Sequence, residues 1–510
     1  MERGENAPAR RDVTEYGLRR ILIVGGVMLA SLMQTLDSTI TNVALPTIQG
    51  NLGATQEEAT WVVTAYTIAA IIVIPITPWL QDRFGRKNYF VGSIVGFTLA
   101  SIACGASSSL SFLIVSRIVQ GAFGGGLLAT AQAILRETFP PSQLGASQGI
   151  FAIGAIMGPA LGPPLGGYLV DAASWNWVFD INVIPGTVAG ILLFVLLRDP
   201  ESRRGMQVDT VGLALLAAGL GSMQYVLTEG EQHYWLADAA IRWTAVICIV
   251  SLVGLVWWEL RAREPIVDLR IFRNRSVAAG SLLALTLGMA VFGTTYVLPQ
   301  LTQGPLGFTP SLSGDLFLLR ALPIFLATPI VVRLSGKVDP RYLLVFGFLM
   351  ISLGSWFQYQ ITTDLSAFWS FTAALVATGI GSAFLFIPLS IAVLGATTPR
   401  EGPNAGAMVN LSLQLGGSIS VALLNVVIDR RWSYYSTLFG ANQTLANPQT
   451  RAFLAHGSVA QLSRIVNGQA AVAAYADAAL VIAVVGALFI PLIFLMRKPQ
   501  APAGPVGVGH

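Results

Sequence analysis

Apolar runs of about 20 residues recur along the whole chain, and short polar segments separate them. A helix of this length crosses the hydrocarbon core of a bilayer, where only helices and closed barrels satisfy all backbone hydrogen bonds. Of the residues, 11% are charged, whereas soluble domains carry about 25%. The sequence therefore predicts an all-α, multi-pass membrane protein. We expect fourteen spans, at residues 21–45, 60–80, 88–108, 110–133, 146–170, 177–197, 209–228, 241–260, 275–301, 312–334, 341–361, 367–392, 404–428 and 474–496.

The positive charges predict how the chain is oriented. Most lysines and arginines lie in the loops of one side, which includes the terminal segments 1–20 and 497–510. Cytoplasmic loops carry such an excess, so both termini are predicted to be cytoplasmic. The net charge of +4 comes from these loops and does not suggest nucleic-acid binding. In this arrangement the polar segment 430–473 is predicted to be a long outer loop.

A weak internal repeat indicates two related halves. Asp82-Arg-Phe-Gly-Arg-Lys87 follows the second span, and Lys337-Val-Asp-Pro-Arg341 follows the tenth. Transporters that are built from repeats place such loops equivalently. We expect an N-terminal six-helix half at 21–197, two inserted helices with linkers at 198–274, a C-terminal six-helix half at 275–496, and cytoplasmic tails at 1–20 and 497–510.

Residues 149–167 carry a stripe of glycines at every fourth position. On a helix this spacing leaves a nearly straight face without side chains, which a partner helix can approach backbone to backbone. The prolines of this stretch remove backbone donors, so the helix is expected to bend. We interpret it as a closely packed helix at a moving interface; the alternative is tight packing without a directional role. The residues are Gly154, Gly158, Gly162, Gly166, Pro159, Pro163 and Pro164.

The same stretch resembles motif C of the major facilitator superfamily, the signature of its proton-coupled exporters. That motif is a glycine, eight residues, a glycine, three residues, Gly-Pro, two residues and Gly-Gly. The chain matches it at Gly149, Gly158, Gly162, Pro163, Gly166 and Gly167. The resemblance implies a major facilitator fold with fourteen transmembrane helices, two six-helix halves plus two inserted ones, in which this helix seals the interface.

Asp37 lies about two-thirds of the way along the first span. A carboxylate at membrane depth costs a few kcal/mol, so it is expected to face the bundle interior and to be functional. Burial favours the protonated form of a carboxylic acid, which suits a proton carrier. The alternative is a permanent ion pair. Residues 36–46 resemble the span 1 motif of the fourteen-span drug:proton antiporters of the EmrB/QacA type.

Arg117 lies in the fourth span, and its surroundings resemble motif B of the superfamily, in which the arginine is linked to proton transfer. The first span runs outward and the fourth inward. Counted from the outer ends at about 1.5 Å per residue, Asp37 and Arg117 reach similar depth. We predict that they face the same cavity and pair, and that substrate and proton compete for Asp37.

The loop after the second span resembles motif A, whose aspartate locks the outward-facing state in the family. The corresponding residues, predicted to form a cytoplasmic gate, are Asp82, Arg83, Gly85, Arg86 and Lys87. The first motif position, normally glycine, is Pro78 here. Ordinary inside-positive charge is the alternative explanation for the basic residues.

Further polar and aromatic residues at membrane depth are candidates for a large, mostly apolar substrate cavity. Arg320 is expected either to bind anionic groups or to pair with Asp315. Leu413 stands where the family often has arginine, which leaves the charge preference for substrate open. The candidates are Gln34, Thr41, Tyr66, Gln120, Tyr296, Arg320, Phe384, Asn410 and Gln414.

The sequence gives no indication of a cofactor, a metal site or an enzyme. It contains no phosphate-binding loop of the Gly-x-x-x-x-Gly-Lys type and no zinc pattern. Cys104 and Cys248 lie in apolar runs without metal-ligand spacing.

The resemblance implies a proton-coupled antiporter of the bacterial inner membrane that exports lipophilic or toxic compounds. Small lipophilic substrates, protons and lipid are its expected partners, with a periplasmic adaptor and an outer-membrane channel as further candidates. Export of a specific metabolite, lipid or siderophore is the first alternative, and a membrane-embedded enzyme is the second.

Overall fold

The computed structural model describes residues 14–140, 143–198, 209–231, 233–262, 265–398 and 401–496. Every regular element in these ranges is helical. Within them, 14 helical segments are long and apolar enough to cross a membrane. The predicted all-α fold with fourteen spans is therefore confirmed.

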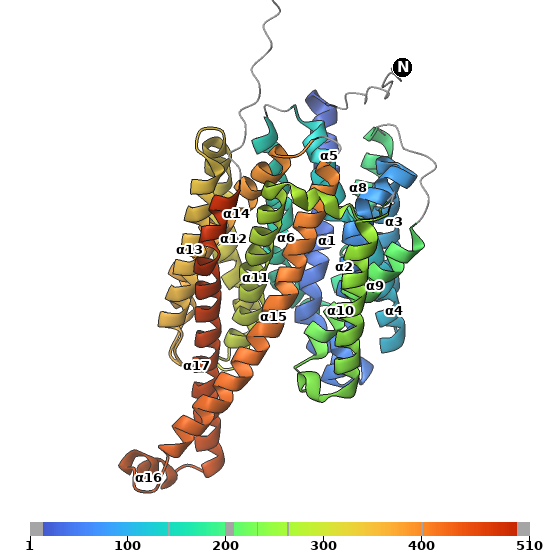
Figure 1. The fold of residues 1–510 in the computed structure, drawn as a ribbon. Helices are drawn as coiled ribbons and strands as arrows, with labels where there is room; N and C mark the ends of the chain where they lie inside the picture. The colour runs from blue at the N-terminus through green and yellow to red at the C-terminus, as the bar shows by residue number, and fades with distance from the viewer. Residues whose placement is uncertain are drawn as a thin grey trace, which may run out of the picture.

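The helices form two bundles that stand side by side (Figure 1). The first, which we call the N-bundle, consists of α1 (Gly17–Leu52), α2 (Gln56–Phe84), α3 (Arg86–Gly105), α4 (Leu110–Gly124), α5 (Leu127–Thr138), α6 (Leu144–Ala172), α7 (Trp177–Asp180) and α8 (Val183–Leu196). The second, the C-bundle, consists of α11 (Arg275–Gln303), α12 (Pro310–Ser335), α13 (Pro340–Ile361), α14 (Thr372–Gly395), α15 (Gly402–Ala441), α16 (Pro448–Leu454) and α17 (Val459–Leu488).

Two helices lie between the bundles in sequence, α9 (Thr210–Glu229) and α10 (Ala239–Glu259). They pack on each other, and α9 also contacts α2 and α15. Short 3-10 helices also connect or end the longer ones, among them Trp235–Ala237, Leu269–Arg273, Phe368–Phe371 and Ile490–Leu495.

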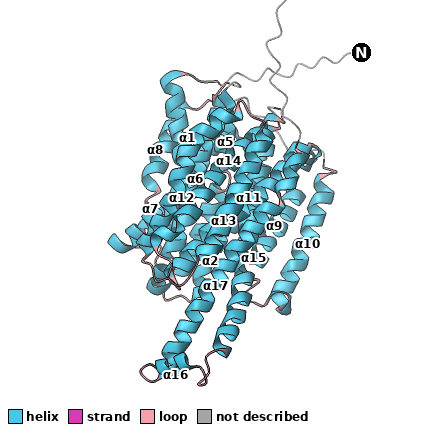
Figure 2. Ribbon diagram, turned by 90° about the vertical axis from the view of Figure 1, so that its left-hand side faces the viewer, coloured by secondary structure: helices cyan, strands magenta, loops and turns pink. Residues whose placement is uncertain are grey.

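Both described chain ends lie at one side of the bundles, which we call the tail side; the opposite side, which α16 occupies, is the α16 side (Figure 1). At the α16 side, α15 and α17 continue well beyond the other helices as a two-helix projection, also visible in Figure 2. The prediction of a long loop at 430–473 is therefore wrong. Most of this segment extends α15 and α17, because a polar sequence can continue a helix as readily as it can form a loop.

The glycine stripe of α6 faces α1 within the N-bundle. A Cβ atom on Gly158 would lie 2.5 Å from the backbone nitrogen of Leu36, and Gly154, Gly162 and Gly166 also abut α1. Threonine hydroxyls hold the two helices together, since Thr35 Oγ1 donates to the Gly154 carbonyl at 3.3 Å. The glycines at every fourth position therefore face α1 and not the other half, so the expectation that they lie at the interface between the two halves is wrong.

A different face of α6 packs against α12 of the C-bundle. A Cβ atom on Gly149 would lie 2.5 Å from Val332, and one on Gly314 would lie 2.9 Å from the backbone of Pro164. Close contact therefore exists near both ends of the α6–α12 seam. Helix α6 thus joins α1 to the opposite bundle, with small residues at both contacts.

We predict that Gly158→Ala destabilises the protein although alanine favours helices. The new methyl group collides with the backbone of α1, and such overpacking costs about 1–3 kcal/mol. Gly25→Ala is the matched control, because Gly25 lies in helix α1 with open space around it. Thermal unfolding of the purified protein should show a lower midpoint for Gly158→Ala alone. Equal midpoints for the two variants would contradict the close packing of α1 on α6.

Candidate functional site

Asp37 and Arg117 form an ion pair inside the N-bundle. Arg117 Nη1 on α4 donates to Asp37 Oδ2 on α1 at 2.6 Å. Both residues are 0% exposed. The predicted pairing is confirmed. Removing one partner of such a pair leaves an uncompensated buried charge, which makes the pair expensive to break.

Two amides complete the surroundings of the Asp37 carboxylate. Gln120 Nε2 and Asn182 Nδ2 each donate to Asp37 Oδ1 at 2.9 Å. The Ser101 hydroxyl oxygen accepts from the same two amides, at 2.7 Å from Gln120 and 3.4 Å from Asn182. The carboxylate is thus fully hydrogen-bonded, which offsets much of the cost of burying its charge.

Tyr66 on α2 covers the other face of Arg117. The centre of its ring is 4.1 Å from Arg117 Cζ, a cation–π contact. Arg117 Nε also donates to the Val62 carbonyl at 3.0 Å. The Tyr66 hydroxyl accepts a long hydrogen bond, 3.4 Å, from Gln34 Nε2. A chain of contacts therefore leads from the ion pair through Tyr66 to Gln34.

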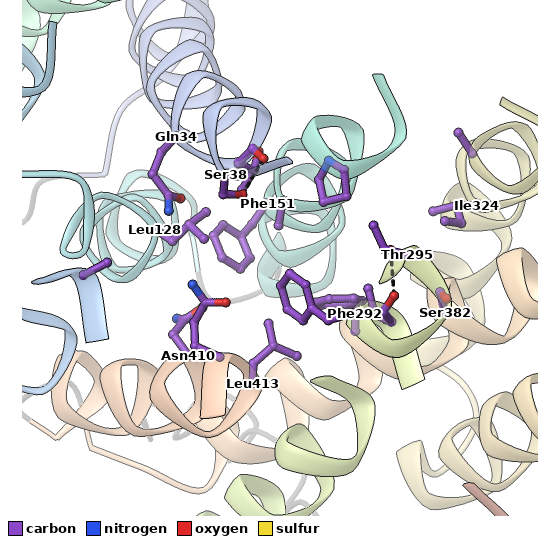
Figure 3. A pocket seen from close by; sticks show the side chains of 18 of the residues that line it. Gln34, Ser38, Leu128, Phe151, Phe292, Thr295, Ile324, Ser382, Asn410 and Leu413 are labelled. Carbon is purple, nitrogen blue, oxygen red and sulfur yellow. Dashed lines mark hydrogen bonds between the residues drawn. The ribbon is translucent and has the colours of Figure 1, made fainter. Parts of the chain in front are cut away.

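Gln34 lines a cavity to which residues of both bundles contribute. In Figure 3, Gln34, Leu128 and Phe151 of the N-bundle face Phe292 and Asn410 of the C-bundle. Its mainly apolar wall with a few polar groups is typical of sites for small lipophilic molecules. The lining residues are Gln34, Thr35, Ser38, Ala70, Ile74, Gly125, Leu128, Phe151, Ala155, Pro159, Val291, Phe292, Thr295, Phe317, Arg320, Ala321, Ile324, Ser382, Phe386, Asn410, Leu413 and Gln414.

Four of the predicted cavity residues line this space, namely Gln34, Arg320, Asn410 and Gln414. The prediction is wrong for five others. Tyr66 and Gln120 turn toward the ion pair, and Thr41 Oγ1 donates to the backbone carbonyl of Asp37 at 3.0 Å. The remaining two are Tyr296, which donates to Asn425, and Phe384, which packs on Phe346 while Phe386 lines the cavity.

The ion pair itself does not line the cavity either, contrary to the prediction that Asp37 and Arg117 face it. Its neighbours on α1 do line the cavity, namely Gln34 and Thr35 before it and Ser38 after it. Successive residues of a helix point about 100° apart and residues three positions apart still differ by about 60°, so depth alone did not determine the direction of the carboxylate.

Arg320 lies in the cavity wall and has no partner of opposite charge. Among the described residues, no carboxylate lies within ion-pair distance of it, so the alternative of a pair with Asp315 is wrong. Asp315 is exposed, five positions earlier on α12.

Polar side chains bridge the two bundles at the tail side. Arg136 Nη2, at the end of α5, donates to the carbonyls of Leu394 at 2.8 Å and Thr397 at 3.3 Å. Gln132 donates to Ser390 Oγ at 3.3 Å and accepts from Asn410 Nδ2 at 3.3 Å. A cation at the C-terminal carbonyls of a helix is favourable, so α14 supplies a suitable acceptor for Arg136.

The predicted gate residues occupy the α2–α3 corner at the tail side. Asp82 and Arg83 are exposed at the end of α2, and Gly85 has a φ of 84°, which favours glycine. Arg86 forms an ion pair with Glu137 of α5, within the N-bundle. Lys87 lies 5.3 Å from the ring centre of Phe194. The gating role of these residues stays a prediction.

Comparison with known proteins identifies the family. The profile described as Major Facilitator Superfamily matches residues 27–419. The chain belongs to the major facilitator superfamily. It is 34% identical over 441 residues to "Multidrug export protein EmrB" of Escherichia coli (strain K12), covering 86% of this chain and 85% of that protein. It is 32% identical over 426 residues to "Fatty acid resistance protein FarB" of Neisseria gonorrhoeae, covering 82% of each. The predicted resemblance to EmrB-type proteins is confirmed.

A solved structure supports the fold. The human organic anion transporter MFSD10 superposes with a TM-score of 0.62 at 14% sequence identity, covering 94% of this chain and 99% of that chain. At this identity the likeness concerns the fold alone, and it agrees with a major facilitator arrangement of the helices.

Several residues of this superfamily member escaped the sequence analysis. Asn182, Gln132 and Arg136 hold the ion pair or the bridge between bundles, and Glu137 pairs with Arg86. Each is a polar residue in or beside an apolar run, which is the signal that singled out Asp37. Their partners lie far away in sequence, so no spacing rule could reveal them.

We predict that Asp37→Asn is more destabilising than Arg117→Gln. The first leaves Arg117 as a buried cation that cannot lose its proton, at a cost of about 3–5 kcal/mol. The second leaves a carboxyl group that can become neutral by binding a proton. The double variant should recover much of the loss, because neither charge remains. Reversible unfolding in mixed detergent and SDS measures these free energies; additive losses would contradict a direct pair.

We predict that Arg136→Ala opens the tail side. The variant lacks the hydrogen bonds from Arg136 to the end of α14. A cysteine introduced in the cavity by Ser38→Cys should then react several-fold faster with an impermeant maleimide added on the tail side. Cys104 and Cys248 are replaced by serine in all variants so that only the new thiol reacts. Arg333→Ala, which removes an exposed cation near the tail-side end of α12, is the control. Unchanged labelling in Arg136→Ala would show that the bridge does not hold the tail side closed.

Proposed function

We propose that the chain is a proton-coupled efflux antiporter that exports lipophilic or toxic compounds, of the multidrug type, by alternating access. The carrying observation is the fully buried Asp37–Arg117 pair near a mostly apolar cavity between the two bundles. Its relatives are named for multidrug export and for fatty acid resistance, which supports export of lipophilic molecules.

Asp37 is the proposed proton carrier. A proton that binds its carboxylate removes the negative charge, so the ionic part of the bond to Arg117 is lost. Arg117 keeps hydrogen bonds to the Val62 carbonyl and to Gln120 Oε1, at 3.0 and 2.6 Å, so it stays in the bundle after the pair is weakened. When the proton leaves, the pair forms again.

Tyr66 and Gln34 are the proposed connection between proton and substrate. Substrate that touches Gln34 in the cavity disturbs its hydrogen bond to Tyr66, whose ring covers Arg117. Conversely, protonation of Asp37 changes the position of Arg117, and this change reaches Gln34 through Tyr66. The two events are coupled without sharing one site, which replaces the direct competition at Asp37 that the sequence suggested.

Alternating access is proposed to use the two bundles as rocking bodies. The boundaries expected from the sequence, 21–197, 198–274 and 275–496, describe these bodies and the inserted helices. The motif C helix, α6, would carry the movement at its contact with α12, and Arg136 would hold the tail side closed. Asp82 of the gate segment is the proposed latch that engages in the outward-facing state.

The protein is proposed to lie in the bacterial inner membrane with the tail side in the cytoplasm. The excess of lysine and arginine in the tail-side loops supports this orientation. The projection of α15 and α17 would then extend from the outer face, where a periplasmic adaptor protein leading to an outer-membrane channel is a candidate partner.

The alternative is an exporter of a specific metabolite, lipid or siderophore. The FarB relative, named for fatty acid resistance, favours a narrower substrate range of this kind. An enzyme has less support, because the matching family and the similar proteins are transporters.

We predict that Asp37→Asn abolishes proton-driven efflux. In inside-out vesicles that are energised by a pH gradient, dye transport should fall to the level of vesicles without the protein, since asparagine cannot carry a proton. A protonophore should do the same to the wild type. Asp171→Asn, a change at an exposed carboxylate near the end of α6, should transport normally. Undiminished transport by Asp37→Asn would exclude this residue as the proton carrier.

A further inference from the structure

The cavity wall carries a single kind of charge. Arg320 is the one ionisable side chain among the described residues that line it. The buried carboxylate of the N-bundle, Asp37, is already paired with Arg117, which Tyr66 covers. The wall presented to a substrate is therefore apolar and positive.

Arg320 is buried but poorly satisfied. It is 7% exposed, and its Nε–H has no hydrogen-bond partner. Its Nη1 lies 3.4 Å from the Val291 carbonyl and its Nη2 lies 3.5 Å from Ser382 Oγ. Both distances exceed the usual range of about 2.7–3.2 Å. By contrast, Arg117 in the other bundle holds a carboxylate at 2.6 Å. A buried cation without a counterion is costly, and here the missing group has room in the cavity.

We propose that Arg320 is the binding site for the negative charge of the substrate, and that the cavity takes lipophilic monoanions with a carboxylate head. This deepens the proposed export function and rests on it. The guanidinium fork fits a carboxylate through two parallel hydrogen bonds. The apolar part of the substrate then lies against the aromatic side chains of Phe292, Phe317 and Phe386.

The geometry also places the anion away from the proton carrier. Arg320 belongs to α12 of the C-bundle, whereas Asp37 belongs to α1 of the N-bundle. On the N-bundle side of the cavity, Figure 3 labels two polar side chains, Gln34 and Ser38, and both are uncharged. A lipophilic cation finds no exposed carboxylate in this wall, so cations should bind weakly.

The test compares three molecules with the same ten-carbon chain and different heads: decanoate, decyltrimethylammonium and decanol. Each is titrated by calorimetry into the full-length protein in phosphatidylcholine nanodiscs, with empty nanodiscs subtracted. Decanoate should bind at least about tenfold more tightly than decyltrimethylammonium, the size expected for a charge-assisted hydrogen bond. Equal affinity for the anion and the cation would overturn the proposal.

Variants assign the difference to Arg320. Arg320→Gln should lose the preference for decanoate while its affinity for decanol is unchanged, which also shows that the cavity is still folded. Arg320→Lys should keep part of the preference, because the charge remains without the fork. Arg333→Gln removes an exposed arginine from the same helix and should behave as the wild type. Undiminished decanoate binding in Arg320→Gln would overturn the proposal.

A further arm uses nanodiscs that also contain phosphatidylglycerol. Unchanged decanoate affinity supports a freely diffusing organic anion, whereas loss of decanoate binding would assign Arg320 to a lipid headgroup and overturn the proposal. The binding assay tests the role of Arg320, and the transport assay tests the proposed export function, so the two can be judged separately. If proton-driven dye efflux persists without anion preference, the inference is wrong and the export function stands. If anion preference persists without proton-driven efflux, the export function is wrong.

Discussion

The structure depends on one buried ion pair and on the packing that keeps it dry. Asp37 and Arg117 are both removed from solvent, and the energy of their attraction is needed to offset the loss of hydration. Gln120 and Asn182 occupy the remaining acceptor sites, and Tyr66 covers the guanidinium. With these partners in place, the membrane interior holds two charges at a tolerable cost. A proton that removes one of them changes the balance of the whole cluster.

Because the ion pair does not line the cavity, substrate and protons do not have to bind the same carboxylate. If the substrate touched Asp37 directly, the affinity for substrate and for protons would be tied to the same carboxylate. Here Asp37 does not line the cavity, and the contact runs from Arg117 through Tyr66 to Gln34, which does. In the proposed mechanism, Arg320 in the other bundle determines the charge of the substrate. The proposal thus assigns the proton and the substrate to different residues, and it assigns their coupling to the rocking of the two bundles.

Much of the fold was predictable because membrane insertion imposes simple rules. Span number followed from apolar length, and the pairing of Asp37 with Arg117 followed from depth and from the cost of unpaired charge. The direction of a side chain around its helix did not follow. Phe384 and Phe386 looked equivalent in sequence, yet one packs on Phe346 and the other lines the cavity. The helical extension at 430–473 was missed because polarity reports the solvent and not the backbone conformation.

Helix α1 shows why these parts belong together. One of its faces lies on the glycine stripe of α6, where Thr35 and Thr39 donate to the carbonyls of Gly154 and Gly158. Asp37 points from α1 into the N-bundle, where it pairs with Arg117. Gln34, one turn earlier on the same helix, lines the cavity. Because the stripe has no side chains, the backbones of α1 and α6 approach closely, so the two helices are firmly packed on each other. Any shift of α1 that weakens the pair must also move Gln34, and α6 passes the same shift to α12 across the seam between the bundles.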